Sequence, residues 1–478
     1  MKKILCFIYS LCFFAACAVP GIMLFKPDKN GSSEKRTLAE LPQLFDENGE
    51  INRKWNSDFE SFVSDNFGFR TSLVRADGLL KAKLFGTSSE EKVIVGKEGW
   101  LYYSPTADDF IGNRTVSDLG ISNIVRNLSL MQEYAELHGS RFITAVVPNK
   151  NSIYPEFMPV NYIRSGENNN LDALGECLSV SGINYCDLYE VITNEKSRSD
   201  TLLYHKTDTH WNNSGALAGY RGIMAALDIP FENFDKSDYI TEKTWDGDLS
   251  TMLFPDSVEK DYQNEYDIAF NYTYLGHYRG TDDITINTMN PVGENDLLMF
   301  RDSFGAAVIP YFSENFASAR YSRARPYPLY NLEKTAFDVT VLEIVERNIA
   351  WLQREAPMHS ALTADALPTA ENSCGGTMYT EKNESFIHIY GTDDLSDRLT
   401  SAPEKYITLT DTNNNTIHYK AYNCYESELL GDTEILDCGY SLYISTSELT
   451  ENETYTVDLT VNSELGCFGC ALGEFKFE

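Results

Sequence analysis

The protein has 478 residues, of which 42% are hydrophobic and 23% are charged. This composition supports a folded core and excludes intrinsic disorder as a description of the whole chain, and the length predicts two or three structural units. The 39 Lys and Arg residues against 71 Asp and Glu residues give a net charge of −32. Nucleic acid is therefore excluded as a partner, because polyanions are bound by basic clusters and the sequence contains no basic stripe.

The first 25 residues predict an export signal or a membrane anchor. Two lysines precede a run from Ile4 to Phe25 that contains no charged residue, and about 20 apolar residues can span a bilayer as a helix. The small residues Ala15-Ala16-Cys17-Ala18 would suit cleavage of a signal peptide, and lipidation of Cys17 is a third alternative. The length of the run favours an anchor at residues 1–25, with the rest of the chain exported.

Residues 26–90 predict a polar spacer followed by the N-terminal helical region of the next unit. Polar and turn-forming residues fill Lys26 to Glu50. Apolar side chains then recur at helical intervals from Trp55 to Val63. The following segment, Val93 to Tyr103, has two short apolar runs on either side of a Gly-containing turn, which predicts a β-hairpin.

Residues 91–355 alternate between helix and strand patterns. Amphipathic periodicity predicts helices, and uninterrupted apolar runs predict buried strands. The predicted helices cover 121–138, 171–178 and 214–227, and the predicted strands cover 142–147, 183–185, 297–300 and 339–344. Buried strands that are separated by helices indicate a parallel sheet covered on both faces, so we expect an α/β fold.

The sequence changes character after an Ala-, Pro- and Thr-rich linker at residues 356–372. In residues 373–478, apolar and polar residues alternate between polar turns, which predicts an antiparallel β-sandwich as an accessory domain. Five of the ten cysteines lie there, as in an exported, disulfide-bonded module. Cys467 and Cys470 form a CxxC pair, for which a structural role is favoured over redox or zinc chemistry.

The densest chemical signal lies at residues 204–212. Asp208 and His210 stand two residues apart just before a predicted helix, so the carboxylate can orient the imidazole ring and stabilise its protonated form, as in a hydrolytic triad. Two other roles suit the same residues. Asp208 can cap the helix while His210 packs beneath it, or the pair can bind a metal. The local spacing leaves these alternatives open.

A second signal is Ser303, in the segment Arg301-Asp302-Ser303-Phe304-Gly305 directly after the predicted strand at 297–300. Turns at the carboxyl end of a parallel sheet expose nucleophiles, and their backbone N–H groups can bind an oxyanion. A helix cap is the simpler role for Ser303 and is favoured on the pentapeptide alone.

Several motifs follow one another between Glu34 and Ile349: Lys35-Arg36-Thr37-Leu38 with Leu41-Pro42, Asp65-Asn66-Phe67-Gly68-Phe69-Arg70, Gly96-Lys97-Glu98-Gly99-Trp100-Leu101-Tyr102, Val147-Pro148-Asn149-Lys150, Asp208-Thr209-His210-Trp211, Arg301-Asp302-Ser303-Phe304 and Glu343-Ile344-Val345-Glu346-Arg347. Together they resemble the SGNH hydrolase-like proteins related to the alginate O-acetyltransferases AlgX and AlgJ, including the DHHW group. The resemblance implies an SGNH-like three-layer α/β/α domain with a parallel sheet.

The same resemblance implies a catalytic triad of Asp208, His210 and Ser303. The base precedes the nucleophile here because the family is circularly permuted relative to ordinary SGNH esterases. The DHHW group has two adjacent histidines where this chain has Thr209 followed by His210, and only the second histidine belongs to the triad. The backbone N–H of Ser303 is the expected first donor to the oxyanion.

Other residues are candidates for secondary roles. Asn149 and Asn212 are candidates for the second oxyanion donor. Trp211 can be a platform for a sugar ring or part of the core, and the core is favoured because large aromatic side chains are usually buried. Arg323 and Arg325 can contact an anionic polysaccharide, although ordinary solvated or ion-paired arginines are the favoured interpretation.

The activity implied by the resemblance is O-acetylation of a cell-surface or secreted polysaccharide through an acyl-serine, with no metal or cofactor. A membrane-bound O-acyltransferase would supply the acetyl donor, the accessory domain would hold the glycan, and the protein would be tethered at the cell surface or in the periplasm. Water as the acceptor would make the same site an acetyl esterase. A non-catalytic glycan-binding scaffold is the alternative from another class.

Overall fold

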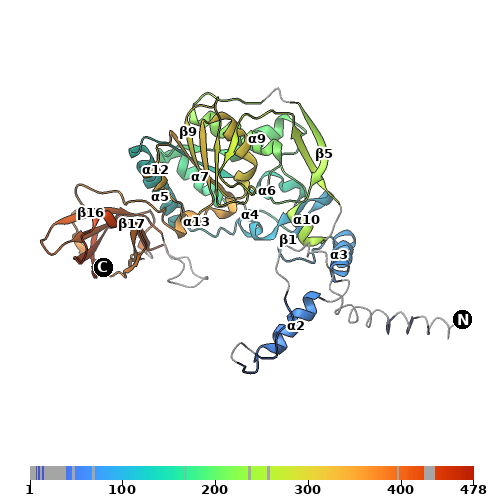
Figure 1. Ribbon diagram of the computed structural model, residues 1–478, viewed down its shortest axis with the longest axis horizontal. Helices are drawn as coiled ribbons and strands as arrows, with labels where there is room; N and C mark the ends of the chain where they lie inside the picture. The colour runs from blue at the N-terminus through green and yellow to red at the C-terminus, as the bar shows by residue number, and fades with distance from the viewer. Residues whose placement is uncertain are drawn as a thin grey trace.

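The structure is a computed structural model that describes residues 39–45, 49–66, 70–166, 168–234, 238–255, 259–395, 398–424 and 437–478, with five positions between Phe7 and Phe14 (Figure 1). The anchor predicted at residues 1–25 otherwise lies outside the described residues, as does the motif that begins at Lys35. Among the helices that are described, none has both the length and the apolar character needed to cross a bilayer.

A seven-stranded sheet forms the centre of the larger part of the molecule (Figure 1). The five strands β4, β3, β11, β9 and β10 are parallel in that order, and β8 and β7 extend the sheet in antiparallel pairing. The strands are β3 (Arg141–Val147), β4 (Tyr185–Cys186), β7 (Thr273–Leu275), β8 (Thr285–Met289), β9 (Asp296–Phe300), β10 (Ser318–Ser322) and β11 (Val339–Val345). The predicted α/β fold is confirmed.

Helices cover both faces of this sheet. Successive side chains of a strand point to opposite faces, so Ile143 and Val147 of β3 enter one apolar core while Phe142 and Val146 enter the other. The first core is closed by α8 (Leu188–Arg198), α9 (Asn213–Leu227) and α11 (Ile309–Asn315), and the second by α5 (Asp118–Leu137), α7 (Asn170–Ser181) and α13 (Trp351–Arg354). The domain therefore has the three-layer α/β/α arrangement.

Helix ends follow the sequence signals. Ser117 caps α5 by accepting a hydrogen bond from the N–H of Gly120, and the helix ends before Gly139, whose φ of 76° suits glycine at a helix stop. Asn212 caps α9 in the same way. Both helices lie within two or three residues of their predicted ends, because capping residues and apolar periodicity agree there.

Several smaller elements lie outside the central sheet. The predicted helix beginning at Trp55 is α2 (Trp55–Asn66), and the predicted hairpin is formed by β1 (Val93–Val95) and β2 (Leu101–Tyr103). A two-stranded ribbon of β5 (Tyr239–Trp245) and β6 (Asp261–Tyr266) was not predicted. The remaining helices of four or more residues are α3 (Arg70–Leu80), α4 (Ala107–Phe110), α6 (Lys150–Ile153), α10 (Asp248–Leu253) and α12 (Asn331–Lys334).

The C-terminal part contains two further β-sheets, which enclose a separate apolar core. One sheet has the order β12-β19-β18-β15-β16 and the other β13-β14-β17, with antiparallel pairing except between β12 and β19. The strands are β12 (Asn372–Ser373), β13 (Tyr379–Lys382), β14 (Phe386–Thr392), β15 (Glu404–Thr410), β16 (Thr416–Ala421), β17 (Gly439–Ser445), β18 (Thr454–Ser463) and β19 (Gly466–Lys476). The predicted antiparallel β region is confirmed.

A disulfide joins Cys374 to Cys470 within this β region. Cys470 is therefore bonded outside its CxxC motif, and its role is structural. Disulfides persist in oxidising compartments outside the cytoplasm, which agrees with the predicted export of the chain.

The β region packs directly on α5 (Figure 1). The side-chain N–H of Asn127 in α5 donates to the carbonyl oxygens of Leu352 and Asn423 at 2.9 and 3.1 Å, and the backbone N–H of Asn423 donates back at 2.8 Å. The segment predicted as a linker, 356–372, pairs with the β region through the backbone N–H of Ala361 and the backbone oxygen of Leu362. These contacts join the two parts through polar groups and a shared apolar core.

Candidate active site

Three side chains from two distant segments form a continuous hydrogen-bonded chain. Nε2 of His210 lies 2.9 Å from Oγ of Ser303, and Nδ1 of the same ring lies 2.7 Å from Oδ1 of Asp208. Asp208 and His210 belong to the loop before α9, while Ser303 follows β9 and precedes a short 3₁₀ helix, η5 (Phe304–Val308). Folding thus brings together the three residues singled out in the sequence. Asp208 is buried, with 4% of its side chain exposed, whereas His210 keeps 26%.

Asp208 is held on both of its carboxylate oxygens. Oδ1 also accepts the backbone N–H of His210 at 2.9 Å, and Oδ2 accepts the indole N–H of Trp245 and the backbone N–H of Asp248, both at 2.9 Å. Burial alone would raise the pKa of Asp208, but the His210 ring and these N–H donors hold that pKa well below its usual range. Asp208 is therefore a carboxylate at neutral pH.

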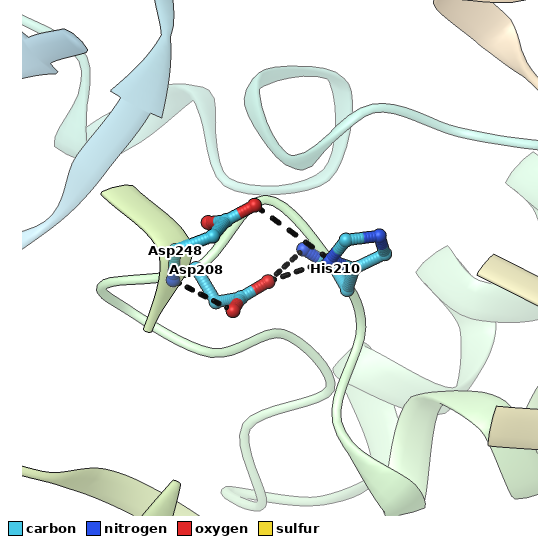
Figure 2. A group of neighbouring side chains, drawn as sticks. All are labelled: Asp208, His210 and Asp248. Atoms are coloured by element: carbon cyan, nitrogen blue, oxygen red, sulfur yellow. Dashed lines mark hydrogen bonds and ion pairs between the residues drawn. The ribbon is translucent and has the colours of Figure 1, made fainter. Parts of the chain in front are cut away.

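A second carboxyl group, Asp248, lies on the same side of the imidazole ring as Asp208, near the same ring nitrogen (Figure 2). Its oxygens accept the backbone N–H and the hydroxyl of Thr209 at 2.8 and 2.7 Å, and Oδ2 lies 3.9 Å from Nδ1 of His210. Burial and the nearby Asp208 raise the pKa of Asp248. Asp248 thus fixes the backbone between Asp208 and His210 from outside the loop.

Asp208, His210 and Asp248 are close enough together to suit a metal ion, with one ligand atom of each within 4.8 Å of the others. The oxygens that a metal would need already accept hydrogen bonds from Trp245, Thr209 and backbone N–H groups. The far nitrogen of His210 faces Ser303. The donor set therefore fits an oriented imidazole better than a metal centre.

Lys150 stabilises the loop that contains Asp208 by hydrogen bonds to its backbone. This buried side chain, at the carboxyl end of β3, directs its ammonium group at the backbone carbonyl oxygens of His205, Lys206 and Asp208. Burial lowers the pKa of Lys150 to about 8, while the charge of Asp208 opposes that shift. Three donated hydrogen bonds fix the loop that presents Asp208.

The turn that carries Ser303 is built by its neighbour Asp302. Oδ1 of Asp302 accepts the backbone N–H of Phe304 at 2.9 Å, and Oδ2 accepts the backbone N–H of Val345 and the side-chain N–H of Asn348, both at 2.9 Å. Because Val345 and Asn348 belong to the end of β11 and the turn after it, the Ser303 turn is tied to the neighbouring parallel strand. The nucleophile candidate thus stands on a rigid edge of the sheet.

Comparison with known proteins agrees with this architecture. Residues 93–281 match the family model described as "SGNH hydrolase-like domain, acetyltransferase AlgX". The probable alginate O-acetylase AlgJ of Pseudomonas syringae pv. tomato is 26% identical over 262 residues, which are 53% of this chain and 61% of AlgJ. This part of the chain is therefore similar to the AlgX/AlgJ family of SGNH hydrolase-like acetyltransferases.

Solved structures similar to this chain include a DHHW family protein from Eubacterium siraeum and PatB1 from Bacillus cereus. The DHHW protein is 15% identical with a TM-score of 0.40, and PatB1 is 15% identical with a TM-score of 0.42. In both comparisons the match covers 54% of this chain and 95% of the other. The family resemblance predicted from the sequence motifs is confirmed by the family match.

The two asparagine candidates for the oxyanion have different surroundings. Asn212 is fully engaged, because its side-chain oxygen accepts two N–H groups of the first turn of α9 and its amide donates to the oxygen of Leu202 at 2.6 Å. Asn149 is buried, its backbone N–H donates to Glu346, and its side-chain oxygen has no partner among the described residues. The unpartnered atom of Asn149 is an acceptor, which cannot donate to an oxyanion, so it does not by itself distinguish Asn149 as the second donor.

The three weaker candidates for substrate contact all have partners within the fold. Trp211 is 2% exposed and its indole N–H donates to the oxygen of Phe304 at 3.0 Å, so the favoured core interpretation agrees with the structure and no face is open for a sugar. Arg323 pairs with Asp282 at 2.9 Å. The guanidinium of Arg325 lies 3.6 Å from the centre of the Trp351 ring. Both arginines therefore have intramolecular partners.

The sequence patterns did not single out Trp245 and Asp248, because these residues follow Asp208 by 37 and 40 positions. Gly247, which lies between Trp245 and Asp248 in the sequence, is the residue that could have pointed to this loop contact. A side-chain carbon at that position would stand 2.3 Å from the backbone oxygen of Thr207, so only glycine allows the two loops to approach so closely.

Proposed function

We propose that this protein is an O-acetyltransferase that acts on a cell-surface or secreted polysaccharide through an acetyl-serine at Ser303. The observation that carries the proposal is the hydrogen bond of 2.9 Å between Nε2 of His210 and Oγ of Ser303, with Asp208 on the other ring nitrogen. A nucleophile, a base and a group that orients the base are the parts that acyl transfer needs.

In the first half of the reaction, Nε2 of His210 accepts the hydroxyl proton of Ser303 while Oγ attacks the carbonyl carbon of the acetyl donor. The resulting oxyanion is stabilised by the backbone N–H of Ser303, with the side-chain amide of Asn149 as the candidate second donor. The tetrahedral intermediate collapses, the bond to the leaving group breaks, and His210 returns its proton to that group. Asp208 stabilises the imidazolium throughout, since its low pKa keeps it charged.

In the second half, a sugar hydroxyl replaces the departed donor. His210 accepts the proton of that hydroxyl, the sugar oxygen attacks the acetyl carbonyl carbon, and the bond to Oγ of Ser303 breaks. The proton on His210 then returns to Ser303, which restores the starting state. If water entered instead of the sugar, the same steps would release acetate.

The proposed setting is outside the cytoplasm. The disulfide between Cys374 and Cys470 supports an oxidising compartment, and residues 1–25 would tether the chain to the membrane. A membrane-bound O-acyltransferase would deliver the acetyl group, and the C-terminal β region would hold the glycan close to the α/β domain. Similarity to a probable alginate O-acetylase supports a polysaccharide as the acceptor.

A burst assay tests the proposal directly. The purified chain is mixed with a chromogenic acetyl ester, beside Ser303→Ala, with and without oligosaccharide acceptors. Release that depends on Ser303 and transfers acetyl groups to a sugar would establish a transferase. Release that no acceptor changes would favour an esterase, and absence of release from the folded protein would favour a non-catalytic scaffold.

A further inference from the structure

Trp245 is the last residue of β5 and lies beside the proposed triad without belonging to it. The indole N–H donates to Oδ2 of Asp208 at 2.9 Å. Oδ1 of the same carboxylate accepts from His210, whose other nitrogen meets Ser303. Three consecutive hydrogen bonds of 2.7 to 2.9 Å thus link the indole to the serine hydroxyl.

One face of the Trp245 ring is covered. The imidazole of His205 stacks on it with ring centres 4.7 Å apart and planes within 5° of parallel. His205 is itself buried and fixed, because its Nδ1 lies 3.0 Å from the backbone oxygen of Tyr262 on β6. The indole is therefore rigidly held from behind and along its N–H edge.

Trp245 is nevertheless 38% exposed. Since His205 covers one face and Asp208 takes the N–H edge, the exposed surface lies on the opposite face and the remaining edge of the ring. A large aromatic side chain usually loses this surface to the core, as Trp211 does at 2% exposure. Three hydrogen bonds in series separate this indole from the serine hydroxyl. An immobilised indole with an open face is a surface on which a flat, weakly polar ring of a ligand can stack.

We propose that Trp245 has two roles: its N–H positions Asp208, and its open face binds a sugar ring of the acceptor near Ser303. The second role rests on the proposed function, because it names the part of the acceptor that the site holds. Of the two tryptophans beside the triad, Trp245 is the one with a surface for this contact, in place of the buried Trp211.

Two substitutions separate these roles. Trp245→Phe keeps an aromatic face but removes the N–H, and Trp245→Ala removes both. We expect both variants to release acetyl from the chromogenic ester about tenfold more slowly, because a hydrogen bond to a charged carboxylate is lost. We expect the acceptor KM of Trp245→Ala to rise about tenfold, while that of Trp245→Phe stays within about threefold of the parent.

Binding is measured separately from catalysis in the full chain carrying Ser303→Ala. Calorimetric titration with cellopentaose, chitopentaose and a mannuronate pentamer is expected to detect at least one ligand, whose affinity falls when Trp245→Ala is added and persists with Trp245→Phe. The matched control is Tyr239→Ala, at the other end of β5, where the ring is 44% exposed and far along the strand from the Asp208 contact. Tyr239→Ala should change neither the rate of ester release nor the affinity for the oligosaccharide.

The outcomes that overturn the proposal are distinct from failure of the proposed function. Equal sugar affinity in the Trp245→Ala and Trp245→Phe backgrounds, or no binding of any of the three oligosaccharides, overturns the sugar-binding role. Unchanged ester release in Trp245→Phe overturns the positioning role. If the parent protein releases no acetyl at all, the proposed function fails, while the titrations still decide whether Trp245 binds a sugar.

Discussion

The two parts of this molecule use buried charge in different ways. In the C-terminal β region, Lys405 and Asp393 form an ion pair at 2.7 Å with 1% of each side chain exposed, and the ammonium group also donates to the backbone oxygens of Cys438 and Gly439. Beside the α/β sheet, Asp208 is as deeply buried, but it accepts a hydrogen bond from His210, which keeps a quarter of its side chain exposed.

The difference distinguishes buried charge that stabilises the fold from buried charge that serves a reaction. A buried ion pair that solvent does not reach contributes only to the fold. Removing one partner leaves the other charge buried and uncompensated. A carboxylate that ends in a partly exposed imidazole next to a hydroxyl is arranged to move a proton. Substitutions in the two regions should therefore have opposite signatures, with lost activity in a stable protein on one side and lost stability in an active protein on the other.

The largest effect is expected for Ser303→Ala. The variant lacks the oxygen that would carry the acetyl group, so kcat for ester release should fall by about 10⁵-fold. Thermal unfolding should be within a few degrees of the parent, because Ser303 lies at the surface end of a turn held by Asp302. Retention of more than a tenth of the activity would remove Ser303 from the mechanism.

Asp208→Asn is expected to lower kcat by about 10³-fold, since the amide cannot stabilise the imidazolium and can hold the wrong tautomer of His210. Steady-state rates of ester release measure this loss. The matched control is Asp187→Asn, at the N-cap of α8 and away from the triad, which should leave the rate unchanged. A change of less than tenfold in Asp208→Asn would contradict an orienting role for the carboxylate.

Lys405→Met is expected to lower the free energy of unfolding by about 3 to 5 kcal/mol, because Asp393 would remain buried without its partner. Denaturant titration measures the loss, and ester release per folded molecule should stay within about twofold. A fall in kcat comparable to that of Asp208→Asn would show that the two regions are not separable in this way.

The smallest effect concerns Glu346, whose pKa is raised to about 7 by burial. Between pH 4.5 and 7 this carboxyl binds more protons when folded than when unfolded, so the free energy of unfolding falls as the pH rises, by up to about 3 kcal/mol. Glu346→Gln removes that slope, whereas Glu136→Gln on the exposed side of α5 keeps it. Parallel pH profiles for the parent and Glu346→Gln would contradict the raised pKa.

The main helices and strands of the α/β sheet could be predicted because capping residues and apolar periodicity agree along the chain. Strands β7, β8 and β10 and the ribbon of β5 and β6 could not. Strand β10 contains Arg320 and Tyr321 in a Tyr- and Arg-rich stretch, yet the Arg320 guanidinium is paired with Asn287 and Asn331 inside the fold. Ribbon β5 is exposed along its length and has no apolar alternation to predict it.

The candidate site likewise combines contacts that the sequence could predict with contacts that it could not. The proximity of Asp208 and His210 is local, so two residues of spacing were enough to suggest it. Their contacts with Trp245 and Asp248 cross about 40 residues of chain and depend on the close approach of two loops at Gly247. Such contacts follow from packing and leave no periodic trace in the sequence.

The most direct test of the account is to locate the acetyl group during turnover. The full chain is mixed with the chromogenic acetyl ester, quenched in acid within the burst phase, digested and mapped by mass spectrometry, in parallel with His210→Ala. The account predicts one acetyl group on the peptide that contains Ser303, absent from His210→Ala and discharged when an accepted oligosaccharide is added. Rapid ester consumption with no acetyl group on Ser303, or with the group on another residue, would contradict it.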